Sequence, residues 1–147
     1  MKKFRFQLDT VLGYKQQVLD NRLVEHGAAA AQTREQEAVF NAVQVRLTEY
    51  EDEYRQKKAA GLNILELQLY QDCLEALHRE EMREQERLVQ LQQIEEEKRS
   101  RVIESRTETA TLEKLRDIKH KEYLKELQKD EERFIDDLTA ARRYMNA

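Results

Sequence analysis

One short interruption around Gly61 divides an otherwise unbroken helical pattern. Glycine suits the end of a helix, because it adopts a left-handed backbone conformation without a Cβ clash. Asn63 can cap a second helix, with Glu66 at the capping-box spacing and Leu62 and Leu67 at the positions of a hydrophobic staple. Stop and start signals so close together favour two long helices folded back as a hairpin. The alternative is one continuous rod that tolerates a glycine.

The composition indicates a coiled coil. Of the 147 residues, 38% are charged and 39% hydrophobic, and there are three glycines and no proline. Long paired helices of this composition bury a narrow seam rather than an enclosed pocket. The predicted fold class is therefore all-α, with two long helices in an antiparallel coiled-coil hairpin. We expect a single domain over 1–147, with helix 1 at about 9–60, a turn at about 61–63 and a longer helix 2 at about 64–145.

Charge and cysteine content point to a cytoplasmic protein that binds no nucleic acid. The net charge is −4, with both signs closely interleaved, so no coherent positive field is expected. The one cysteine, Cys73, excludes an intramolecular disulfide and fits a reducing compartment. No apolar run approaches membrane-spanning length, and the N-terminus lacks the apolar segment of a secretory signal.

A heptad register can be followed along the first helix. The opening Phe4-Arg5-Phe6-Gln7-Leu8 is interpreted as an extended or frayed lead-in, with Asp9 or Thr10 as the helix cap. The register places apolar residues near both ends of the helix, namely Leu8, Leu12, Leu19, Phe40, Val43, Leu47, Tyr50 and Tyr54. Its middle is weak: Arg22, His26, Ala29, Thr33 and Gln36. His26 has no metal-ligand partner at suitable spacing, which favours a partly buried histidine over a ligand.

The second helix alternates apolar and charged positions along its register, which runs through Leu67, Tyr70, Leu74, Leu77, Glu81, Glu84, Leu88, Leu91, Glu95, Lys98 and Val102. Glu81 and Glu84 repel each other unless a cation faces them, so we expect a marginally stable hairpin. Near Leu112 the phase slips by one residue. A fresh register then follows Leu124, Leu127, Glu131, Phe134, Leu138, Ala141 and Met145.

Two apolar surfaces exceed what a two-helix seam can bury. With helices of about 80 Å and 120 Å, Leu8 should face Leu115, and roughly thirty residues of helix 2 then overhang. That amphipathic overhang needs a partner from another chain, and self-association is the alternative. At the turn, a second stripe comprises Leu62, Leu65, Leu69 and Cys73. Either the tip closes by local folding of Leu62 and Ile64, or one stripe is a docking surface, which we favour.

Signals of catalysis are missing from the sequence. It has no glycine-rich phosphate loop, nucleophile elbow or Cys-x-x-Cys pair. Carboxylates near His78 and His120 are expected by chance in so charged a chain. Asp136 and Asp137 point about 100° apart on a helix and do not converge on one atom. We expect no enzyme activity, metal or cofactor.

Two stretches carry a family resemblance. The opening reads Phe4-x-Phe6-x-Leu8-x-x-Val11-Leu12-x-x-Lys15, an aromatic start that a generic coiled coil does not need. The later stretch reads Leu112-Glu113-Lys114-Leu115-Arg116, then Tyr123, Glu131-Glu132 and Asp136-Asp137. Both resemble FliJ, the small coiled-coil component of the flagellar type III export apparatus, and helix lengths agree over nearly the whole chain.

The resemblance implies a stalk similar to the coiled coil of the rotary ATPase gamma subunit. It also implies partners, namely the hexameric export ATPase FliI, its regulator FliH, the export gate protein FlhA and export chaperones. In the family, an aromatic residue and a leucine four residues apart early in the second helix are associated with gate contact. Tyr70 and Leu74 match that spacing, although both also fit the intramolecular seam.

With the surplus stripe, the predicted gate site becomes Leu65, Leu69, Tyr70 and Leu74. By fold-level analogy the helix ends enter the ATPase ring, through Phe4, Phe6, Leu127 and Phe134. The resulting hypothesis is a non-enzymatic stalk at the cytoplasmic face of the inner membrane. The alternatives are a structural coiled coil forming homodimers or filaments, and an injectisome-type secretion stalk.

Overall fold

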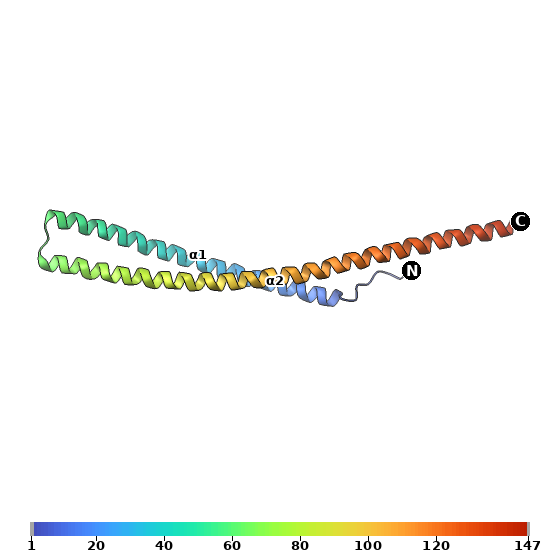
Figure 1. Ribbon diagram of the computed structural model, residues 1–147, viewed down its shortest axis with the longest axis horizontal. Coiled ribbons are helices and arrows are strands. Elements are labelled where there is room, and N and C mark those ends of the chain that lie inside the picture. Colours follow the sequence, from blue (N-terminus) through green and yellow to red (C-terminus); the bar gives the residue numbers. More distant parts are fainter. Residues whose placement is uncertain (1, 147) are drawn as a thin grey trace. The chain divides into compact units, whose positions relative to one another are not determined.

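Two helices make up nearly all of the computed structural model, which describes residues 2–146 (Figure 1). Helix α1 spans Asp9–Ala60 and has 52 residues, and helix α2 spans Ile64–Met145 and has 82. Residues 2–146 contain no strand. Ion pairs such as Lys15–Glu108 and Arg46–Glu80 join residues far apart in the sequence. The predicted all-α hairpin with a longer second helix is confirmed.

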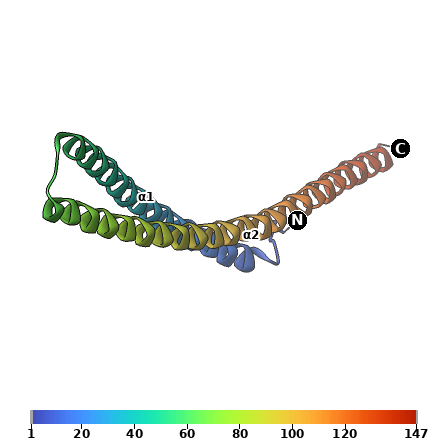
Figure 2. The same cartoon turned by 60° about the vertical axis from the view of Figure 1, so that its left-hand side comes forward.

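The turn between the helices has the geometry that glycine permits. Gly61 has a φ of 105°, and its N–H donates to the Lys57 carbonyl at 3.0 Å, which satisfies one of the last carbonyls of α1. Asn63 Oδ1 accepts from the Glu66 N–H at 2.8 Å and caps α2. Figure 2 shows the short segment that joins the two helix ends. The continuous rod is thereby excluded.

The start of α1 differs from the expectation. The Leu8 carbonyl accepts the first helical bond, from the Leu12 N–H at 2.8 Å, and the Asp9 N–H donates to the Phe6 carbonyl at 3.1 Å. Leu8 therefore occupies the cap position, and the prediction of Asp9 or Thr10 as the cap was wrong. The turn from Phe6 to Asp9 sets the entry into α1 in place of a capping side chain.

The chain divides into two compact units, each built from both helices. The turn unit comprises Arg22–Val102, and the terminal unit comprises Met1–Asn21 with Ile103–Ala147. The prediction of a single domain stays a prediction.

Apolar and polar layers alternate along the seam of the turn unit. Val43 is 1% exposed, and Ala29, Leu47 and Val102 are also buried. In the weak middle, the buried Gln36 donates from Nε2 to the Glu84 carbonyl at 3.0 Å and also to the Glu84 carboxylate. Glu84 therefore obtains a neutral amide donor, which offsets its repulsion from Glu81 without a cation.

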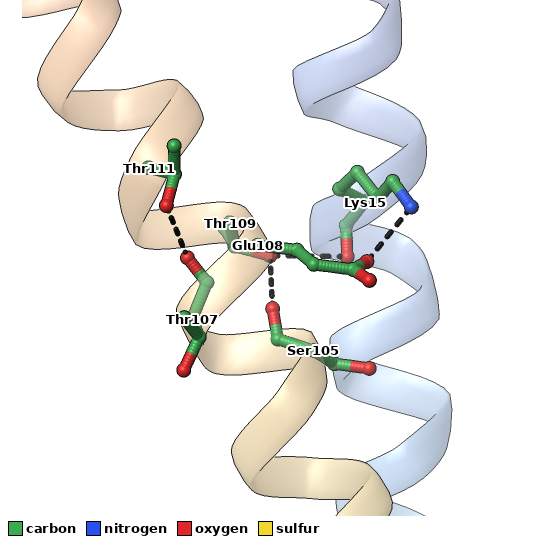
Figure 3. Close-up of polar contacts among 6 residues, drawn as sticks. All are labelled: Lys15, Ser105, Thr107, Glu108, Thr109 and Thr111. Atoms are coloured by element: carbon green, nitrogen blue, oxygen red, sulfur yellow. Dashed lines mark hydrogen bonds and ion pairs between the residues drawn. The ribbon is translucent and has the colours of Figure 1, made fainter.

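A second polar layer lies in the terminal unit, where Glu108 and Thr109 of α2 meet Lys15 of α1 (Figure 3). Lys15 Nζ and Glu108 Oε2 form an ion pair at 2.8 Å. Hydrogen bonding to that carboxylate raises the pKa of Lys15. The buried Thr109 hydroxyl donates to the Ser105 carbonyl at 2.8 Å and lies 3.4 Å from the Lys15 carbonyl on the other helix. These polar contacts replace apolar packing where the two helices meet.

A contact from outside the heptad pattern marks the start of the last part of α2. Tyr123 is half-buried, whereas Leu124, the first residue of the predicted fresh register, is 47% exposed. The Phe4 ring packs on the Tyr123 ring, with centroids 5.6 Å apart. Tyr123 therefore faces the N-terminal segment.

Candidate partner-binding surfaces

The start of α2 exposes three large apolar side chains. Ile64, Leu65 and Leu69 are 84%, 78% and 64% exposed, and Cys73 is exposed one turn further on. Leu65, Leu69 and Cys73 lie on one helix face, because residues four apart are neighbours there. We call Ile64, Leu65 and Leu69 the turn surface. Of the second stripe that the sequence predicts, Leu65, Leu69 and Cys73 are therefore exposed, whereas Leu62 is half-buried.

Tyr70 and Leu74 lie in the seam and are half-buried. The Tyr70 ring contacts two aromatic rings of α1, with its centroid 5.2 Å from that of Tyr50 and 5.4 Å from that of Tyr54. The Tyr70 hydroxyl donates to Glu53 Oε1 at 3.2 Å. The predicted gate site thus splits into an exposed pair, Leu65 with Leu69, and a seam pair, Tyr70 with Leu74.

This tyrosine cluster has an unusual titrating group. Hydrogen bonding with the Cys73 side chain, burial, and the charges of Cys73, Tyr70 and Glu53 together raise the pKa of Tyr50 to about 12. Lys57 Nζ lies 5.8 Å from the centroid of the Tyr70 ring, within cation–π range. The tip of the hairpin is therefore held by aromatic and polar contacts together.

In the terminal unit, the N-terminal segment lies along α2. The Phe4 ring meets the His120 ring edge-on at 4.9 Å between centroids, and the Tyr123 hydroxyl donates to the Lys2 carbonyl at 2.8 Å. Phe4 and Phe6 are half-buried. An open groove of about 910 Å³ runs beside them and is lined by Lys2, Lys3, Phe4, Arg5, Phe6, Gln7, Leu8, Leu115, Lys119, Glu122, Tyr123 and Glu126. Leu8 and Leu115 both line it.

The last part of α2 extends beyond these contacts. Leu127 is half-buried, and every residue from 128 to 146 is exposed. We call 128–146 the tail. Phe134, Leu138 and Met145 in it are 64%, 55% and 85% exposed. The four residues predicted for the ATPase ring are therefore divided, with Phe4, Phe6 and Leu127 half-buried and Phe134 presented to solvent. Because the N-terminal segment covers α2 as far as Tyr123, the overhang is shorter than the sequence indicated.

The described residues show no arrangement typical of chemistry or membrane insertion. Residues 2–146 hold no group of three or more His, Cys, Asp or Glu side chains placed to bind a metal ion. No helix within that range combines the length and apolar character needed to cross a membrane. The half-buried His26 lies in the seam of the turn unit, as expected.

Of two local aromatic clusters, sequence reasoning implied one and missed the other. The contact of Tyr70 with two tyrosines of α1 follows from the register, since all three positions were assigned to the seam. The packing of Phe4 on His120 had no such signal, because a heptad pattern does not describe an extended segment. The aromatic residues of the opening were its one visible sign.

Taken together, the two long helices form a hairpin with exposed apolar side chains in each unit, which defines a coiled-coil protein. A family model described as flagellar FliJ protein matches residues 4–147. The chain belongs to the FliJ family, so the resemblance seen in the sequence is confirmed. The family provides a non-catalytic component of the flagellar export apparatus. Neither a curated protein nor a solved structure gave a significant match.

Proposed function

We propose that the protein is a stalk-like coiled coil that couples the export ATPase ring to the export gate. The ring is the FliI hexamer with its regulator FliH, and the gate partner is FlhA. The observation that carries the proposal is that each unit exposes its own apolar surface, the turn surface in one and the tail in the other. The protein would act at the cytoplasmic face of the inner membrane, held there by its contact with the gate.

The turn surface is the proposed contact with the gate. Leu65 and Leu69 are free to enter an apolar groove of a partner, since their side chains are more than half exposed. Tyr70 and Leu74 would influence the gate contact indirectly, without touching the partner. Their contacts with α1 fix the first turns of α2 and so fix the direction in which Leu65 and Leu69 point.

The terminal unit is the proposed contact with the ATPase ring. Phe134 offers an exposed aromatic side chain, the kind of residue that anchors many protein interfaces. Phe4 and Phe6 contribute through the groove beside the N-terminal segment. Leu127 is half-buried immediately before the tail and would contribute an apolar contact there.

The hydrogen bonding within the helices and the packing between them would allow one helix to move against the other. Backbone hydrogen bonds inside each helix make the helices stiff along their axes. The seam between them is softer, because buried polar side chains interrupt its apolar layers. Thr33, Gln36, Ser105 and Thr109 are the buried polar residues of the seam. Docking at one unit can therefore shift one helix against the other.

The gate contact is tested by paired double variants. Leu65→Ala with Leu69→Ala should lower affinity for the gate protein at least tenfold and leave helicity and unfolding unchanged. Tyr70→Ala with Leu74→Ala is the matched control in the seam, and it should lower the unfolding midpoint. Titration calorimetry with the gate protein and circular dichroism report the two effects. Unaltered gate affinity in the Leu65, Leu69 variant would remove the turn surface from the proposal.

The match to a flagellar family model favours the flagellar system over an injectisome-type stalk. A purely structural homodimer or filament is the remaining alternative. The same calorimetry separates it from the proposal, because a protein that binds only itself gives no heat with the gate protein beyond dilution.

A further inference from the structure

The tail carries an apolar stripe that continues the spacing of a coiled coil past the last contact with α1. The stripe begins just before the tail, at Leu124 and Leu127, and follows alternating steps of three and four residues through Glu131, Phe134, Leu138, Ala141 and Met145. Residues at this spacing form the a and d positions of a heptad, with Leu124 at a and Leu127 at d. Phe134 and Leu138 remain 64% and 55% exposed. Among residues 2–146, therefore, the seam positions of the tail are all exposed and have no packing partner.

We propose that the tail pairs with the tail of a second copy of this chain, as a parallel, in-register, two-stranded coiled coil. The occupant is identified by charge complementarity beside the stripe. In this heptad, Asp137 occupies a g position and Arg142 the following e position. In a parallel pair, a g side chain meets the next e side chain of the other strand. Asp137 of each copy then faces Arg142 of the other, so the dimer gains this pair twice.

The opposite orientation is disfavoured by the same charges. In an antiparallel pair, g positions face g positions, which brings Asp130 of one copy beside Asp137 of the other. Like charges placed opposite each other are destabilising. Neither Asp137 nor Arg142 forms an ion pair within residues 2–146, so both are available to a second copy.

One residue keeps the tail dimer weak. Glu131 occupies an a position, and a parallel in-register pair brings the two Glu131 carboxylates together across the seam. Two carboxylates that share one site repel each other and resist ionising together. The dimer should therefore be weak and should form reversibly with concentration.

Dimerisation has a consequence for the ATPase contact, and this consequence alone rests on the proposed function. Phe134 serves both the tail dimer and the proposed contact with the ring. A chain in the tail dimer cannot offer the same side chain to the ATPase. The dimer would then be a resting form that separates into single stalks when the ring is present.

Sedimentation equilibrium of the full-length protein tests the dimer. Phe134→Ala with Leu138→Ala should raise its dissociation constant at least tenfold, and Glu131→Leu should lower it at least tenfold. The Leu65→Ala, Leu69→Ala variant, altered outside the tail, is the matched control and should dimerise like the parent. Circular dichroism verifies that each variant remains helical. A monomer at every concentration, or a dimer insensitive to the tail variants, overturns the proposal.

A charge exchange tests the orientation. Asp137→Arg alone and Arg142→Asp alone should each weaken the dimer about fivefold, because each replaces two attractive pairs by two repulsive ones. The double exchange should restore the parental dissociation constant. Cross-linking gives an independent readout: in a Cys73→Ser background, Leu138→Cys should form a disulfide-linked dimer in oxidised glutathione. Failure of the double exchange to restore binding, or failure of the cross-link, overturns the parallel register.

Discussion

The Tyr123 hydroxyl donates a 2.8 Å hydrogen bond to the backbone carbonyl of Lys2, which lies 121 positions earlier in the chain. The contact holds an extended segment against α2 where no helix partner is present. Phe4 adds its edge-on packing against His120, so a hydrogen bond and an aromatic contact act on the same few residues. These contacts shape the groove in which the terminal unit would meet the ATPase.

Two variants should separate the parts of this N-terminal attachment. Tyr123→Phe removes the hydrogen bond but keeps the ring, and it should weaken the attachment by about 1 kcal/mol. Phe4→Ala removes the ring contacts with both His120 and Tyr123 and should weaken it further. Trypsin cleavage after Arg5 measures the release of the segment, with cleavage in α1 as the internal reference. Equal cleavage rates in the parent and both variants would show that the segment is not held.

The three glycines should respond to alanine in opposite directions. At Gly61, with φ at 105°, an added Cβ meets nothing within 4 Å, so the cost of about 1–2 kcal/mol is purely conformational. At Gly13 and Gly27 an added Cβ also meets nothing within 4 Å, and helix propensity should stabilise each by about 1 kcal/mol. Urea unfolding followed by circular dichroism gives all three changes. Stabilisation by Gly61→Ala would indicate that the turn can be replaced by continuous helix.

Two valines on the same helix provide a test of the seam. Val43 is 1% exposed and Val45 is 55% exposed. Val43→Ala should cost about 2 kcal/mol, through lost burial and the cavity left behind. Val45→Ala should stay within about 0.5 kcal/mol of the parent. The free energies of unfolding from urea denaturation check this. Similar values for the two variants would mean that the seam is not closed at Val43.

Alkaline titration should reveal the raised pKa of Tyr50. Its folded pKa of about 12 lies above the ordinary 10.0, so the fold favours the protonated phenol. The associated stability is therefore complete below pH 10 and is lost as the pH rises from 10 to about 12. The absorbance of ionised tyrosine at 295 nm, measured for the parent and for Tyr50→Phe, isolates this group by difference. Cys73→Ala should move the midpoint back toward 10.0. A parental difference curve already centred there would contradict the contact with Cys73.

Much of the fold could be predicted, because its signals are local. Gly61 and Asn63 act on the backbone beside them. The heptad positions predicted from Leu12 in α1 to Val102 in α2 are all half-buried or buried. The prediction failed where a contact came from outside the heptad pattern. The packing of Phe4 on Tyr123 was missed because an extended segment, and not a helix, lies on that face. The cap at Leu8 was missed because a preceding turn, and not a capping side chain, begins α1.

The candidate sites were less predictable than the fold. Spacing placed Leu65 and Leu69 outside the seam but left Tyr70 and Leu74 compatible with either face. Only the positions of Tyr50 and Tyr54 decide that Tyr70 packs inside. Phe134 was recognisable as an apolar residue in register. Its exposure, however, depends on where α1 begins and on how far the N-terminal segment reaches along α2.

Coupling of the stalk to the export ATPase is tested most directly by the rate at which the ATPase hydrolyses ATP in the presence of this protein. The hydrolysis rate of assembled FliI rings should rise with added protein and saturate near one copy per hexamer. Phe134→Ala with Leu138→Ala should abolish the stimulation, while Leu65→Ala with Leu69→Ala should preserve it. A hydrolysis rate that does not change on rings verified as assembled would contradict the stalk mechanism.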